Sequence, residues 1–143
     1  MSDVLFPRSP REQMDGWCYL PRFIDKIRLH LAGKLSADYT ANFAHKGFDA
    51  EWLKCAGLEA DAFIEVVRNT ITDGQVYDWV RTHVRRTPDA KEAFNRWLLN
   101  RGTEEHDPAL RERLRMRKAE AGLGHRDDIQ TFVDFIDADE KRH

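Results

Sequence analysis

Arg22, Asp25 and Lys26 are the residues whose types and spacing best fit a small chemical site. They follow a helix-starting proline and fall on the helix face opposite a stripe of apolar residues. Arg22 and Lys26 would bind an anion, and Asp25 would orient them or act as a base. Trp17 and Tyr39 would form the walls of such a pocket.

Arg8 and Arg11 extend the positive charge towards the N-terminus. They flank Ser9, and the run Ser-Pro-Arg-Glu that begins there is typical of a capping box with proline at the first helical position. The pattern predicts a short helix that ends at Gly16. Two arginines beside a helix N-terminus favour anion binding at that point.

Other interpretations of the same cluster stay open. Arg22 and Asp25 are three residues apart and can pair with each other, so a structural salt-bridge network or a solvated face is the favoured alternative to a ligand site. Leu29 on the same face suggests that this face is covered. An enzymatic role would use Asp25, Lys26 and Arg22, with His45 as a further candidate.

The sequence carries no recognisable metal, nucleophile or nucleotide motif. No metal site is therefore predicted, because five of the six histidines lack ligand spacing (His30, His45, His83, His106 and His125), and the sequence leaves any cofactor unknown. His83 lies on an apolar stripe and is expected in the core. Cys18 and Cys55 are far apart and are expected to act as small, partly buried apolar residues.

Residues 80–118 are basic, with eleven Lys and Arg against six Asp and Glu, whereas the remainder holds twelve against nineteen. Arg111, Arg115 and Lys118 share one helical face, which suits phosphate neutralisation. Acidic neighbours and a pI of about 6.3 disfavour nucleic-acid binding. A weak nucleic-acid interaction through residues 80–118 is therefore the second alternative.

Helical patterns account for most of the chain. One apolar stripe follows the proline at 21 at helical spacing (Leu20, Phe23, Ile24, Ile27, Leu31 and Leu35). Residues 36–48 show no period and predict a long irregular connection. Later helices are expected to start at caps (Asp49, Thr72, Thr87, Asp107 and Asp128). The predicted fold is all-α, about seven short helices in one compact domain over residues 1–143, with a frayed tail from about 137.

Composition agrees with that fold. The chain has 143 residues, enough for one domain, with 41% hydrophobic and 34% charged residues. No apolar run reaches the length of a membrane span, and the first ten residues lack the pattern of a signal peptide. We therefore expect a cytoplasmic protein without a membrane association.

The stretch PRSPRE-x-x-x-G-W-x-x-LPRFIDKIRLHLAG resembles the opening of the family known as domain of unknown function 5069. The resemblance is strongest over residues 7–35 and extends to Tyr39 and to segments 52–57 and 76–80. It implies a small bacterial protein, and it supplies no activity and no catalytic residues.

The sequence thus favours a binding or interaction module with an anion-favouring pocket at the start of the first long helix. The expected partner is an anionic small molecule or a protein.

Overall fold

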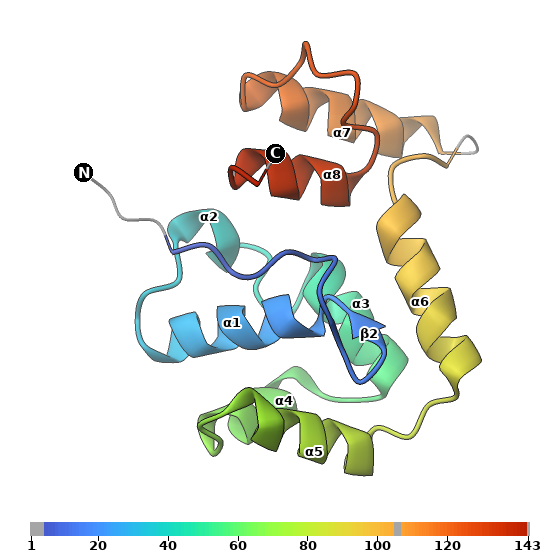
Figure 1. The fold of residues 1–143 in the computed structure, drawn as a ribbon. Helices are drawn as coiled ribbons and strands as arrows, with labels where there is room; N and C mark the ends of the chain where they lie inside the picture. Colours follow the sequence, from blue (N-terminus) through green and yellow to red (C-terminus); the bar gives the residue numbers. More distant parts are fainter. Residues whose placement is uncertain (1–4, 105–106, 143) are drawn as a thin grey trace. The chain divides into compact units, whose positions relative to one another are not determined.

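The computed structural model describes residues 5–104 and 107–142. The described chain is mainly helical, with eight helices and one small hairpin (Figure 1), which confirms the predicted all-α class. The hairpin comprises β1 (Gln13–Met14) and β2 (Trp17–Cys18). The helices are α1 (Leu20–Leu31), α2 (Ala37–Thr40), α3 (Gly47–Ala56), α4 (Ala60–Arg68), α5 (Asp73–His83), α6 (Pro88–Asn100), α7 (Pro108–Glu120) and α8 (Phe132–Asp139).

The chain gathers into two compact units, one ending at Phe94 and the other beginning at Asn95. The first unit contains the hairpin, α1 to α5 and the first half of α6. The second contains the rest of α6 with α7 and α8. One domain over 1–143 stays a prediction. Among the described helices, none has both the length and the apolar character that crossing a membrane requires.

Helix α1 is the centre of the first unit. It packs on α4 and β1, and in Figure 1 it lies between α4 and the N-terminal segment. The ring of Trp52 on α3 lies 6.0 Å from Phe23 of α1, 5.0 Å from Phe63 of α4 and 5.9 Å from Trp17 of β2. These rings are fully buried, so they form the apolar core that joins the hairpin to three helices.

Residues 9–16 form a turn and a hairpin, so the helix predicted there is wrong. Ser9 accepts hydrogen bonds at its carbonyl from Glu12 N (3.1 Å) and at its hydroxyl from Arg11 N (3.2 Å), which closes a single turn. Asp15 and Gly16 then have φ values of 53° and 79°. Both central residues of a two-residue type I′ turn need positive φ, so this dipeptide directs the chain into a hairpin.

The predicted caps explain where α5, α6 and α7 start. Thr72 and Gln75 form a reciprocal capping box, and the Asp107 side chain accepts from Leu110 N at 3.2 Å. The Thr87 hydroxyl accepts from Ala90 N at 3.1 Å in the same way.

The start of α8 differs from the prediction. It begins at Phe132 behind a Thr131–Asp134 capping box rather than at Asp128. The helix continues through Asp139, past the point where fraying was expected, and Arg142 pairs with Asp137 at 3.2 Å. The earlier 36–48 connection is mostly turns, although it contains the single turn of α2, and α3 begins at Gly47.

Candidate functional site

The Lys26 side chain lies in the core of the first unit, bonded to Asp49 of α3. Its Nζ donates to both carboxylate oxygens, at 3.0 and 2.9 Å, and the two side chains are 6% and 0% exposed. Asp49 also accepts from the Tyr19 hydroxyl and from Ala44 N at 2.8 Å. The prediction of Asp49 as a helix cap is therefore wrong, because the carboxylate points into the core.

Two residues that bond to the buried Asp49 carboxylate have an unusual backbone conformation. Tyr19 and Ala44 have φ values of 79° and 62°, a left-handed conformation that costs a non-glycine residue about 1–2 kcal/mol. Burial, followed by the charge of Asp49, raises the pKa of Tyr19 well above its ordinary value of 10. The neutral Tyr19 phenol thus donates a hydrogen bond to Asp49. Together, Tyr19, Lys26 and Asp49 can hold α1 against α3.

Asp25 faces the N-terminal segment. Arg8 Nε and Nη2 bind its two carboxylate oxygens, each at 2.9 Å, and Arg8 N binds it at 2.9 Å as well. Arg8 Nη1 also reaches Asp73 of α5 at 2.8 Å, and Arg28 of α1 binds the other oxygen of Asp73 at 2.6 Å. The paired Asp25 carboxylate raises the pKa of Arg8 above its ordinary value.

Arg22 completes the set around α1. Its Nη1 donates to the Arg8 carbonyl at 3.2 Å, and its guanidinium lies 5.6 Å from the ring centre of Tyr39. Trp17, in contrast, lies in the aromatic core beside Trp52 and Phe94. The contacts of Arg22, Asp25 and Lys26 fit the structural network that the sequence offered as the alternative, and a ligand site at these residues stays a prediction.

The pH dependence of stability tests the Arg8–Asp73–Arg28 part of this network. Burial works to raise the pKa of Asp73, but the hydrogen bonds from Arg8 and Arg28 outweigh it and hold the pKa below its ordinary value of 3.8. A lowered folded-state pKa gives stability that is complete above the unfolded-state value and is lost as pH falls through the folded-state value. The groups are half-exposed, so the contribution is about 1 kcal/mol or less.

We therefore expect Asp73→Asn to flatten the acid side of the stability profile. Urea unfolding of wild type and variant between about pH 7 and pH 2 measures it. The wild type should lose more stability than the variant below about pH 4, and parallel profiles would contradict the role given to Asp73.

Several sequence candidates lie outside this network. His83 is exposed, with its ring stacked 4.6 Å from Trp79, so its prediction as a core residue is wrong. His45 is also exposed, and His106 falls outside the described residues. Within residues 5–104 and 107–142, no group of three or more His, Cys, Asp or Glu side chains is arranged to hold a metal ion.

A basic groove of about 510 Å³ lies where the β1–β2 turn, the α5–α6 connection and the start of α6 meet. One carboxylate, that of Asp15, lines the groove. The other charged side chains that line it are four cations: Arg81, Arg85, Arg86 and Lys91. We call it the α5–α6 groove. The groove is shallow and open to solvent.

Lys91 of α6 fixes one wall of the α5–α6 groove. Its Nζ donates to the carbonyl and the carboxylate of Asp15, at 2.7 and 3.1 Å. A Cβ on Gly16 would lie 3.3 Å from Lys91 Cδ, and Gly16 has positive φ, so glycine lets the turn close against this lysine. The hairpin turn and α6 thus hold each other in place.

Arg86 fixes a second wall through backbone carbonyls. Its Nε and Nη2 donate to Cys55 O and Ala56 O, at 3.0 and 3.2 Å, at the C-terminal end of α3. The guanidinium lies so close to Gly57 that a Cβ there would be 2.5 Å from Nη2. Arg86 therefore satisfies helix-terminal carbonyls and complements the dipole of α3.

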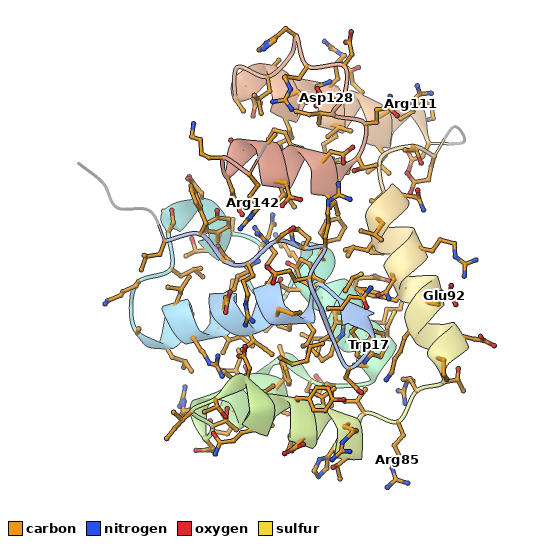
Figure 2. The ribbon with its side chains drawn as sticks, viewed as in Figure 1. Trp17, Arg85, Glu92, Arg111, Asp128 and Arg142 are labelled. Atoms are coloured by element: carbon orange, nitrogen blue, oxygen red, sulfur yellow. The ribbon has the colours of Figure 1, made fainter. Side chains whose placement is uncertain are left out.

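Arg81 and Arg85 form the outer part of the α5–α6 groove. Arg85 Nε donates to Thr82 O at 3.3 Å, and Figure 2 shows its side chain extending away from the ribbon. Arg81 makes a long ion pair of 3.4 Å with Asp78, and both side chains are more than half exposed. Exposed pairs of this kind contribute little, so both guanidinium groups are available to an incoming anion.

The family comparison matches nearly the whole chain. The model of the family described as domain of unknown function (DUF5069) covers residues 4–142. The chain belongs to this family. No curated protein matches the sequence.

For this DUF5069 chain, sequence reasoning found the basic run at 80–87 but not the groove around it. Asp15-Gly16 is a known two-residue hairpin signal, and it could have predicted the turn that supplies Asp15. Nothing in the sequence indicates that Lys91 pairs with a residue 76 positions earlier. The same holds for Lys26 and Asp49, which are 23 positions apart.

Proposed function

We propose that the protein is a binding module for a small phosphorylated ligand, held in the α5–α6 groove. The observation that carries the proposal is the cluster of four cations around one hollow, with Asp15 as the only carboxylate in its described lining. Phosphate groups suit such a site, because guanidinium groups bind two phosphate oxygens at once and lysine adds a point charge.

The arrangement of the four cations supports the same ligand class. Lys91 and Arg86 are held by carbonyl and carboxylate oxygens, so their charges are positioned before a ligand arrives. Arg81 and Arg85 are exposed and can fold onto the ligand. Because the Lys91 and Arg86 side chains are already held in place, ligand binding costs little side-chain entropy at these two residues.

Inorganic pyrophosphate is the probe that tests this function, by isothermal titration calorimetry with the full chain. We expect Arg81→Gln combined with Arg85→Gln to weaken binding at least tenfold, because each charge-assisted hydrogen bond contributes about 1.5–3 kcal/mol. The matched control is Arg68→Gln combined with Lys54→Gln, which removes the same charge from exposed positions in the same unit. It should bind as the wild type does.

Three results would overturn the proposal. The first is the absence of pyrophosphate binding at millimolar concentration, and the second is an equal loss in the control variant. The third is a single-stranded oligonucleotide that binds more tightly than pyrophosphate with a steep salt dependence, which would assign the groove to nucleic acid.

A further inference from the structure

A second groove, of about 420 Å³, lies along α7 in the second unit. Arg111, Arg115 and Lys118 of α7 line it, as the stripe on one helical face predicts, together with Leu114 of the same helix and with Ile129 and Gln130 of the α7–α8 connection. We call it the α7 groove, and its chemistry differs from that of the α5–α6 groove because it has an apolar floor.

The floor consists of Leu114 and Ile129, which line the groove while being almost fully buried. Gly102 keeps the α6–α7 connection close to it. Gly102 has φ of 111°, and a Cβ there would lie 3.2 Å from Leu114 Cδ2 and 3.4 Å from Thr131 Cα. A side chain at this position would displace the floor, so the chain has glycine where the groove needs a tight wall.

The cations of the α7 groove are only partly engaged. The Arg111 side chain forms no ion pair or hydrogen bond with the described residues, and only its backbone N donates, to Asp107 O at 3.4 Å. Lys118 Nζ donates to Ile129 O at 3.2 Å, which uses one of its three protons. Arg115 pairs with Glu112, and both side chains are more than half exposed, so this pair contributes little.

Asp128 on the α7–α8 connection does not line the groove and is bound by Arg126, although its charge also interacts with that of Lys118. Arg126 binds its two oxygens at 2.8 and 2.6 Å, and this hydrogen bonding lowers the pKa of Asp128 to about 2. Figure 2 labels Asp128 and Arg111 in the second unit. The α7 groove therefore keeps a positive rim above an apolar floor.

We propose that the α7 groove binds a small organic monoanion with an apolar body, a medium-chain or aromatic carboxylate. The carboxylate would pair with Arg111 and Lys118, and the hydrocarbon would cover Leu114 and Ile129. A bare phosphate would leave the floor uncovered. Leu114 and Ile129 are already 95% or more buried, so the apolar surface removed from water is mainly that of the ligand's own hydrocarbon, and its burial adds affinity to the charge pairing.

Octanoate is the probe for the α7 groove, titrated into the full chain and followed by calorimetry and by nuclear magnetic resonance of the methyl groups. We expect Arg111→Gln to weaken octanoate binding at least tenfold. Arg113→Gln on the same helix, which does not line the groove, should leave binding unchanged. Neutral octanol should bind at least tenfold more weakly than octanoate, because it lacks the charge that Arg111 recognises.

Several outcomes would overturn this inference. Absence of octanoate binding at millimolar concentration would do so, as would equal losses in Arg111→Gln and Arg113→Gln. Competition by inorganic phosphate as effective as that by octanoate would show that the floor takes no part. The combined Arg81→Gln and Arg85→Gln variant should leave octanoate binding unchanged, so this proposal fails or holds independently of the phosphate proposal.

Discussion

Asp49→Ala is expected to lower the free energy of unfolding by about 3–5 kcal/mol. The substitution leaves the Lys26 ammonium in the core without the carboxylate whose two oxygens it binds. It also removes the acceptor of the Tyr19 hydroxyl and of Ala44 N. Natural domains are stable by only about 5–15 kcal/mol, so this single change removes a large fraction of the total. Urea unfolding followed by circular dichroism measures it.

Two further variants keep this prediction testable. Glu65→Ala, which removes one partner of an exposed ion pair with Arg68, should change stability by about 1 kcal/mol or less. Lys26→Met combined with Asp49→Leu removes both buried charges and should be clearly more stable than Asp49→Ala, because no charge is then left unpaired. An Asp49→Ala variant as stable as Glu65→Ala would contradict the role of the buried pair.

Trp52→Ala should have an effect of similar size, about 3–5 kcal/mol. The indole is fully buried and its ring contacts join β2, α1 and α4, so its removal leaves a cavity that several elements border. Surrounding side chains cannot collapse into such a space without moving whole helices. The free energy of unfolding from urea titration is the quantity to compare with the wild type.

Trp79→Ala is the matched control for the aromatic core. Trp79 is half-exposed on α5, with His83 stacked on it at 4.6 Å and Phe63 at 6.2 Å. Its removal opens no closed cavity, and we expect a loss of about 1 kcal/mol. Equal losses for the two tryptophans would show that Trp52 is not the centre of the core.

The helix starts show which structural features a local sequence pattern can predict. Thr72, Thr87 and Asp107 cap α5, α6 and α7 as predicted, because a cap joins a side chain to backbone groups three residues away. Ser9 begins the same type of pattern and fails, since the Asp15-Gly16 turn and its contact with Lys91 stabilise a hairpin instead. The capping pattern gives no information on that distant contact.

The candidate site shows the same division. The sequence placed Arg22, Asp25 and Lys26 on a covered face and Arg8 beside a predicted helix N-terminus, and the structure brings each of them into contacts within the first unit. It did not identify Asp49 or Asp73, which provide the opposite charges for Lys26, Arg8 and Arg28. A buried cation predicts that a group of opposite charge lies beside it, but it does not predict which residue supplies that group.

The sequence by itself determined the helical class and three of the helix starts, because apolar periodicity and caps act over three or four residues. Only the tertiary structure decided which charges are neutralised and which line a groove, because that depends on side chains brought together over tens of residues. In the structure Asp25 pairs with Arg8 and Lys26 pairs with Asp49, so a ligand site at these residues stays a prediction, whereas the four cations of the α5–α6 groove come from α5, α6 and their connection.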